Sequence, residues 1–524
     1  MLRSKKSLSR RQLLEYASML AAGSFISPVR QVLARPSINF TDYPFKLGVA
    51  SGDPVTDGFV LWTRLAPEPY DLTALPQKSI PVAWLVAEDE KMRKVVQSGT
   101  SLAHGEHAHA VHVEVHGLKP DREYFYCFIA GKEQSAVGRT RTLPLVGKRL
   151  QDFRFAFASC QDITNGYFAA YHDLVQQDPQ LIVHTGDYIY ESIYKEGVRR
   201  IPVPVAMTLD DYRLLHACYK LDPHLQEAHA AAPWLLIWDD HEVENDWGGS
   251  YSESISDPEK FLRRKTAAIK TYYEHMPLRL SAKLRRGRSR IHQRTVIGDL
   301  IEFNLLDCRQ YRDQPPCLDE TGRAPLQIKS CEEALSHDRS MLGREQEDWL
   351  RRGFGTSGTK WNTLVQTTYM APFDYVKGAD TSYKTDGWDG YAASRRRILD
   401  MIVNKHINNP VSIGGEIHAF YAGVVNANAF DLASPPVLSE LVCTSISSGG
   451  GGDERYHETL DLFSENPFAR FFENRVRGYA LCNVNHQRWH TEFRAIADVQ
   501  DPNSPGSTLK ELVIEAGKVD VLSV

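Results

Sequence analysis

Four apolar segments of this chain each end in side chains of the kind that bind metal ions. The segments are far apart along the chain, and each is short enough to be a buried strand of an α/β sheet. Such sheets place ligand-binding groups beyond the carboxyl ends of their strands, so the four segments predict one shared site. The side chains at these ends are a thiol, carboxylates, a phenol and imidazoles: Cys160, Asp187, Tyr190, Asp239, Asp240, His241, Glu416 and His418.

Asp187 follows the run LIVHTG and is the candidate for a carboxylate that bridges two cations. An aspartate after a glycine is ordinarily a turn residue, but Tyr190 follows three positions later and the other strand ends supply matching groups. A phenolate ligand would indicate ferric iron rather than zinc. Cys160 by itself would be a small core residue, and a thiolate beside carboxylates requires a compensating cation.

The segment DDHEVEND, residues 239–246, holds five carboxylates directly after the apolar run WLLIW. This density favours a nearby cation or basic group over the alternative of a solvated acidic loop. In GGEIH, alternation on an extended backbone would turn Glu416 and His418 to the same side. In LDCRQYR, Arg309 could clamp two oxygens of a phosphate group, or could form an ion pair with the acidic segment.

Composition and length limit the function classes. A chain of 524 residues is expected to form two domains, and its 42% hydrophobic and 24% charged residues are typical of globular proteins. The formal net charge of −5 gives no nucleic-acid-binding footprint, and no long uncharged apolar run predicts a membrane span in the mature part. Eight cysteines are too few for a disulfide scaffold, and Cys317 and Cys331 are the pair best placed for any single bridge.

Residues 1–34 have the features of an export signal. A basic stretch precedes a weakly apolar segment rich in small residues, and Val32, Leu33 and Ala34 form a candidate cleavage site. The pair Arg10 and Arg11 predicts the twin-arginine export machinery as a partner, and therefore a periplasmic or secreted protein. The alternative is an amphipathic surface helix.

The remaining chain divides into two predicted domains. Residues 40–145 alternate apolar and polar positions between regularly spaced turns, which predicts a small antiparallel β-sandwich whose last part resembles a fibronectin type III domain. Residues 151–524 alternate apolar strands with helical stretches, including Gly166–Gln177 and Pro258–His275, which predicts an α/β architecture.

Nearly the whole mature chain resembles the alkaline phosphatase D family. The resemblance is carried by ordered motifs, namely FASCQ, GDYIYE, DDHEVEND, LDCRQYRDQ, LGREQEDWL, DGWDGY, GGEIHAF and SISSGGGGD, after an opening with GVASGDP and LWTRL. It implies exported phosphomonoesterases and phosphodiesterases with a calcineurin-like core, a four-layer α-β-β-α sandwich, and a site that combines ferric iron with calcium. Some relatives cleave phospholipids.

The resemblance also implies roles for individual residues. Two departures stand out: Glu416 replaces the usual aspartate with a side chain one methylene longer, and Cys308 stands where threonine is commoner. Asp240 competes with Asn245 for the ligand role that its motif supplies. The implied iron ligands, with Asp187 bridging, are Cys160, Asp187, Tyr190 and His418, and the implied calcium ligands are Asn245 and Glu416.

The predicted reaction is hydrolysis of phosphate esters by water that the cations acidify, with Asp240, His241 and Arg309 as catalytic residues. The expected substrates are small phosphate esters, which include phospholipid or nucleotide diesters, and the expected state is a monomer. One alternative is a phospholipase D-like phosphodiesterase. Another is a non-catalytic periplasmic binding protein that uses its β-sandwich.

Overall fold

The computed structural model describes residues 38–194, 197–325, 327, 329 and 331–524. The export signal predicted at 1–34, with Arg10 and Arg11, lies outside these residues. None of the described helices is long and apolar enough to cross a membrane.

The larger of two central sheets has ten strands, in the order β22-β21-β20-β19-β9-β10-β11-β1-β2-β5. Strands β9, β10, β11 and β1 run parallel at its centre, and β19 pairs antiparallel with β9. Parallel strands of this kind are buried on both faces, which explains their apolar runs. The strands are β1 (Val49–Val55), β2 (Gly58–Arg64), β5 (Ala110–Val115), β9 (Asp152–Ala158), β10 (Ile182–His184), β11 (Trp234–Leu236), β19 (Arg477–Asn485), β20 (Arg488–Ile496), β21 (Gly506–Glu515) and β22 (Leu522–Ser523).

The second central sheet has seven strands, in the order β12-β13-β14-β15-β17-β16-β18. Its middle strands β13, β14, β15 and β17 are again parallel. The strands are β12 (Gln293–Ile297), β13 (Ile301–Leu305), β14 (Trp361–Val365), β15 (Pro410–Gly414), β16 (Phe420–Asn426), β17 (Pro436–Val442) and β18 (Ala469–Glu473).

The two sheets pack face to face around the main core. Phe155 of β9 meets Phe303 of β13 with ring centroids 5.1 Å apart, and Trp361 of β14 meets Trp489 of β20 at 5.9 Å. The opposite face of the seven-stranded sheet packs against α7 and α8, since Leu364 of β14 shares a second core with these helices. Because successive side chains of a strand point to opposite faces, this sheet contributes one face to the main core and the other face to the second core.

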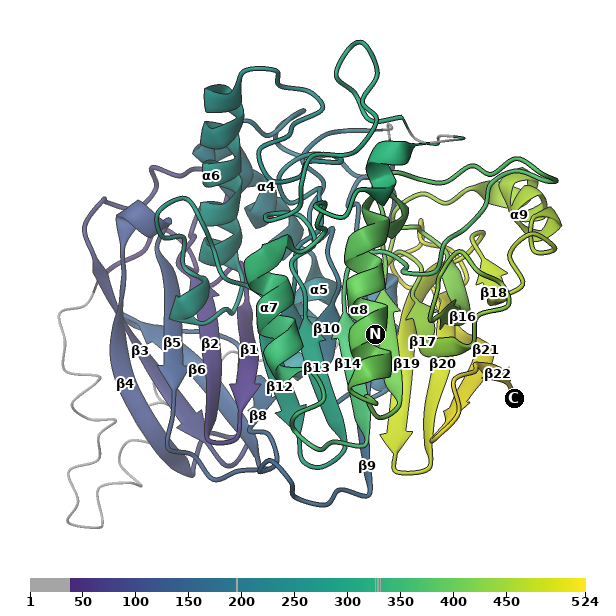
Figure 1. The fold of residues 1–524 in the computed structure, drawn as a ribbon. Coiled ribbons are helices and arrows are strands. Elements are labelled where there is room, and N and C mark those ends of the chain that lie inside the picture. The colour runs from purple at the N-terminus through teal and green to yellow at the C-terminus, as the bar shows by residue number, and fades with distance from the viewer. Residues whose placement is uncertain (1–37, 195–196, 326, 328, 330) are drawn as a thin grey trace.

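Helices cover the outer faces of both sheets (Figure 1). The helices α3 and α5 pack on the ten-stranded sheet, and α7 and α8 pack on the seven-stranded sheet. The predicted helix Pro258–His275 is found with those bounds as α6, whereas the helix predicted at Gly166–Gln177 begins only at Ala169. The helices are α3 (Ala169–Gln176), α4 (Leu209–Lys220), α5 (Pro223–Ala231), α6 (Pro258–His275), α7 (Gly343–Gly353), α8 (Ala392–Asn404) and α9 (Gly452–Asp461). The chain thus has an α/β fold.

The N-terminal strands form two layers, but only one of them is a separate sheet. That sheet has the order β4-β3-β6-β7, with β8 also paired to β6. Strands β1, β2 and β5 pack against it and belong to the ten-stranded sheet, because β1 pairs parallel with β11. The predicted sandwich therefore shares a sheet with the rest of the chain, which strand alternation could not reveal because the pattern is the same in either sheet. The strands of the separate sheet are β3 (Ile80–Ala87), β4 (Val95–Ala103), β6 (Glu123–Ala130), β7 (Glu133–Gln134) and β8 (Gly138–Arg141).

The one bridge expected from the cysteine positions is present. Cys317 and Cys331 form a disulfide in the loop between β13 and α7. The other six cysteines are free and buried, and Cys160 is one of them.

Candidate metal centre

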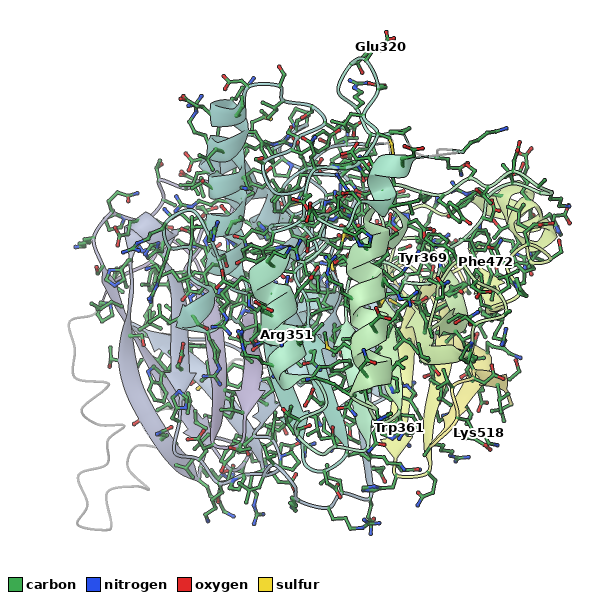
Figure 2. The ribbon with its side chains drawn as sticks, viewed as in Figure 1. Glu320, Arg351, Trp361, Tyr369, Phe472 and Lys518 are labelled. Atoms are coloured by element: carbon green, nitrogen blue, oxygen red, sulfur yellow. A yellow bond between two sulfur atoms is a disulfide. The ribbon has the colours of Figure 1, made fainter. Side chains whose placement is uncertain are left out.

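Most of the predicted ligands line a cavity at the carboxyl ends of the parallel strands, although Cys160 and Tyr190 are not among its lining residues. The cavity has a volume of about 330 Å³, and Asp187, Asp240, His241, Glu416 and His418 line it. Tyr369 and Phe472, which also line it, lie above Trp361 at the start of β14 in the view of Figure 2. The sequence prediction that these strand ends meet is therefore correct in position.

Close contact between loops brings the two sheets together at this end. Ser159, after β9, forms a parallel bridge with Ser445, after β17. A β-carbon at Gly415 would lie 2.2 Å from Ser159 Oγ, so only glycine permits this approach. Gly186 has a φ of 112°, and a β-carbon there would lie 2.5 Å from the β-carbon of Asp239. Two glycines thus allow the ligand-bearing loops to converge.

The first group of donor atoms belongs to Cys160, Asp187 and His418, whose ligand atoms lie within 4.8 Å of one another. The Tyr190 hydroxyl lies 3.1 Å from Asp187 Oδ2 and 3.0 Å from His418 Nε2. His418 Nδ1 lies 2.7 Å from the carbonyl oxygen of Gly449, to which it donates a hydrogen bond. That bond leaves Nε2 unprotonated and directed at the group, as in metal-binding histidines.

The second group consists of Asp187, Asp240 and His241, again within 4.8 Å. Asp187 belongs to both groups, which is the position that a bridging carboxylate requires. His241 Nδ1 lies 2.8 Å from Glu191 Oε2, and its ring stacks on Tyr190 at 4.2 Å. Burial alone would lower the pKa of His241, but the carboxylates of Asp240, Asp187 and Glu191 raise it well above the ordinary value.

Asn245 and Glu416 line the same cavity, and Glu416 belongs to neither of these two groups. The Thr368 hydroxyl donates to Glu416 Oε2 at 3.1 Å. The expectation of an extended backbone at Glu416 and His418 is wrong, because their φ angles are 64° and 51°. Cys160 and Asp187 also have positive φ, at 56° and 57°. Left-handed backbone at four predicted ligands is the kind of local strain that concentrates at functional sites.

The donor set fits cations better than it fits an uncharged core. Burial, and then the charge of Asp187, raises the pKa of Cys160 well above its ordinary value. Burial likewise raises the pKa of Asp187, and the neighbouring Asp240 and Asp239 raise it further. Asp240 Oδ1 is buried and accepts no hydrogen bond from the described residues. Cations would neutralise these groups and complete the coordination of that oxygen.

Arg309 is placed among carboxylates rather than on the cavity wall. Its Nε lies 2.5 Å from Asp239 Oδ1, its Nη1 3.0 Å from Asp386 Oδ1 and its Nη2 3.6 Å from Asp240 Oδ1. Only 2% of the side chain is exposed. These contacts correspond to the ion-pair alternative, and the phosphate clamp stays a prediction without a contact that supports it.

Three residues that sequence reasoning did not single out hold the ligands in place. Glu191 accepts from His241 and, at 3.1 Å, from the Asn245 backbone N–H. Glu242 accepts backbone N–H groups of Asp187 at 3.2 Å and of Tyr188 at 2.6 Å, and so fixes the turn after β10. Ser448 Oγ lies 2.8 Å from the Tyr190 hydroxyl. Glu191 belongs to the motif GDYIYE and Glu242 to DDHEVEND. The motifs do not indicate which of their carboxylates accept hydrogen bonds from backbone N–H groups.

Comparison with known proteins identifies the family. Residues 155–493 match the model of the PhoD-like phosphatase, and residues 31–144 match the model of the PhoD-like phosphatase N-terminal domain. The chain is 41% identical over 492 residues to alkaline phosphatase D of Bacillus subtilis (strain 168), covering 93% of this chain and 83% of that protein. A solved structure described as that of PhoD superposes with a TM-score of 0.88 at 39% identity, covering 93% of each chain. The chain belongs to the PhoD-like phosphatase family.

Proposed function

We propose that this phosphoric ester hydrolase works with two adjacent cation sites that share Asp187. The observation that carries the proposal is the convergence of two donor groups on that one carboxylate. The first site would be formed by Cys160, Asp187, Tyr190 and His418. The second would be formed by Asp187 and Asp240 of the second donor group, together with Asn245 and Glu416, which line the same cavity. Phenolate and thiolate donors at the first site suit ferric iron, and the oxygen donors of the second suit calcium.

Bound cations would polarise a phosphoryl oxygen and lower the pKa of water near the scissile bond. The side chains of this chain do the rest. Glu191 holds His241 through Nδ1, so the remaining nitrogen, Nε2, can protonate or hydrogen-bond the leaving oxygen. Tyr190, stacked on the His241 ring and bound to Ser448, keeps that imidazole in place. Asp239 and Asp386 hold Arg309, whose positive charge would offset that of the buried carboxylates beside the site.

The proposed organisation has three parts. The outer helices and two facing sheets support a four-layer α-β-β-α metallophosphatase sandwich for residues 151–524. Residues 40–145 would form the fibronectin III-like part, whose second layer continues the main sheet. Residues 1–34 would direct twin-arginine export to the periplasm or beyond. We propose a monomer.

The test is the substitution Asp187→Asn. It removes the shared carboxylate charge and should abolish hydrolysis of phosphate esters and lower the metal content, while the circular dichroism spectrum stays that of the parent. Metal analysis of protein purified without chelators should find iron and calcium in the parent. A variant that hydrolyses esters as fast as the parent would refute the shared site.

The ester preference can be measured with two related substrates. Faster turnover of p-nitrophenyl phosphate would define a monoesterase, and faster turnover of bis-p-nitrophenyl phosphate would define a diesterase, the class that includes the phospholipase D-like alternative. A binding protein would hydrolyse neither, and its ligand binding would depend on residues 40–145 rather than on Asp187.

A further inference from the structure

Two cationic side chains face the cavity without a carboxylate partner. Lys384 belongs to the loop between β14 and α8, and Arg455 belongs to α9. Among the described residues, no carboxylate oxygen lies within 4.0 Å of a side-chain nitrogen of either residue. Arg309, in contrast, has three carboxylates around it. Besides His241, the cationic side chains that line the cavity in the described part of the chain are Lys384 and Arg455.

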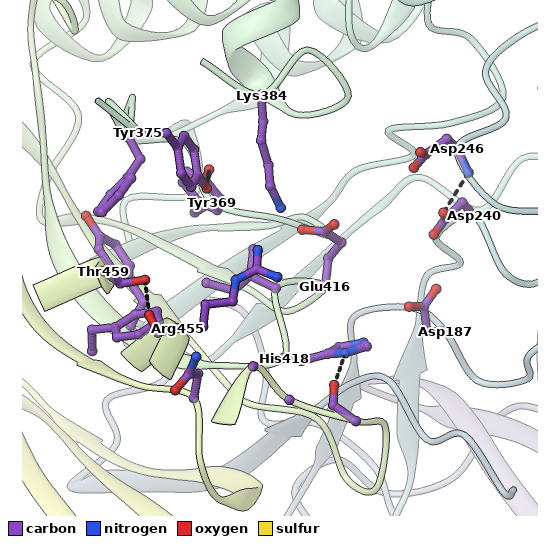
Figure 3. A pocket seen from close by; sticks show the side chains of 18 of the residues that line it. Asp187, Asp240, Asp246, Tyr369, Tyr375, Lys384, Glu416, His418, Arg455 and Thr459 are labelled. Atoms are coloured by element: carbon purple, nitrogen blue, oxygen red, sulfur yellow. Dashed lines mark hydrogen bonds between the residues drawn. The ribbon is translucent and has the colours of Figure 1, made fainter. Parts of the chain in front are cut away.

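Both cations line the same cavity as the metal-ligand cluster. Figure 3 shows Lys384 and Arg455 extending from opposite walls toward the part of the cavity that contains Glu416 and His418. Aromatic rings form much of the remaining wall, which gives an organic group an apolar surface to rest on. These rings belong to Tyr369, Phe373, Tyr375, Tyr421 and Phe472.

The charges of the site explain why these cations would bind an anion rather than serve as counter-ions. The carboxylates of Asp187, Asp240 and Glu416 line the same cavity as Lys384 and Arg455. Cations bound to those carboxylates would neutralise them, and the two side chains would then lack a counter-charge in a half-enclosed cavity. An anionic substrate supplies that charge, and hydrogen bonds to charged groups are the strong ones in such a setting.

We infer that Lys384 binds a non-bridging oxygen of the scissile phosphate, and that Arg455 binds a second negative charge on the organic part of the substrate. This inference rests on the proposed function and deepens it. The substrate class is then phosphate esters whose organic group carries another anion, such as a carboxylate or a second phosphate, with the apolar part of that group against the aromatic wall.

The test uses a matched pair of non-hydrolysable probes, butylphosphonate and 4-phosphonobutyrate, which differ by the terminal carboxylate. Binding to the metal-loaded full chain is measured by isothermal titration calorimetry. The parent should bind 4-phosphonobutyrate about tenfold more tightly than butylphosphonate, which is the ordinary contribution of one charge-assisted hydrogen bond. Arg455→Met should reduce this ratio to about one, and Arg455→Lys should restore part of it.

Lys384→Met should weaken both probes about equally, by roughly tenfold. The control is Lys377→Met, which removes an equal charge from the same loop. Lys377 forms an exposed ion pair with Asp461 at 3.6 Å, and such surface pairs contribute little. It should leave both affinities as in the parent. A parent ratio near one, or an Arg455→Met variant that keeps the parent ratio, would overturn the role of Arg455. Parent-like binding by Lys384→Met would overturn that of Lys384.

The proposed function fails by a different result. Calorimetric binding does not require turnover, so the two affinity ratios test Lys384 and Arg455 directly. A parent protein that hydrolyses neither p-nitrophenyl phosphate nor bis-p-nitrophenyl phosphate would refute the hydrolase mechanism, whatever the ratios are.

Discussion

Replacing Arg309 distinguishes a counter-ion from a phosphate clamp. Its guanidinium contacts Asp239, Asp240 and Asp386, and it is almost fully buried. In Arg309→Met the volume is nearly kept and the charge is lost. Asp386 would still have Arg312, whose Nη2 lies 2.6 Å away. Asp239 and Asp240 would lose their contact with the guanidinium.

The expected cost follows from the burial of these carboxylates. Removing one partner of a buried ion pair typically destabilises a protein by about 3–5 kcal/mol, because the other charge stays buried without compensation. The unfolding free energy of chelator-treated Arg309→Met should therefore fall by about that amount. Bound cations would compensate the same carboxylates, so the loss should be smaller in metal-loaded protein.

The assay is urea unfolding followed by tryptophan fluorescence, with and without chelator, together with steady-state kinetics. A control is Arg395→Met, which breaks the buried pair of Arg395 and Asp389, 2.6 Å apart, neither of which lines the cavity. It should cost a similar free energy that does not depend on metal. If Arg309→Met unfolds like the parent but has a greatly raised KM, the guanidinium serves the substrate and the counter-ion reasoning is wrong.

Two other changes test the site and the scaffold. Glu416→Asp keeps the charge on a shorter side chain and should alter the calcium content or affinity while the iron content is unchanged; equal loss of both metals would contradict separate sites. Burial lowers the pKa of His184 and of His216 to about 3. In the unfolded chain the pKa of each histidine returns to about 6.5. Below that pH the unfolded chain therefore binds more protons than the folded protein, and at about pH 5 each histidine should lower the unfolding free energy by about 2 kcal/mol. His216→Phe should remove its share of this acid sensitivity, since neither ring nitrogen has a hydrogen-bond partner among the described residues; an unchanged pH dependence of unfolding would contradict the assignment.

The meeting of strand ends was predictable because each ligand follows a buried strand in the chain. Cys160 follows β9, Asp187 follows β10 and Asp240 follows β11, so the sheet positions them together. Each of these stretches of sequence contains both the apolar strand and the polar ligand that follows it, so the position of the ligand at the strand end can be predicted locally. Glu416 and His418 follow β15 of the other sheet, so their meeting with these ligands depends on how the two sheets face each other, which the apolar runs do not report.

The partners of Arg309 were not predictable in the same way. Asp386 lies far along the chain in a loop, and only the folded structure shows that it shares the guanidinium with Asp239. Lys384 and Arg455 follow no apolar strand and carry no motif, so their position on the cavity also had no local signal. Side chains that meet across loops are set by tertiary contacts, which sequence spacing does not report.

The backbone of the ligand loops indicates how metal binding relates to folding. Cys160, Asp187, Glu416 and His418 all have positive φ, a conformation that costs of the order of 1–3 kcal/mol for a residue other than glycine. Backbone hydrogen bonds support this conformation: the N–H of Cys160 donates to the carbonyl oxygen of Gly186, and the N–H of Gly415 donates to that of Thr367. The fold itself therefore stabilises the left-handed backbone at these residues and places the ligand atoms close together. Loss of a single ligand such as Asp187 should change the bound metal and the chemistry while leaving both sheets folded.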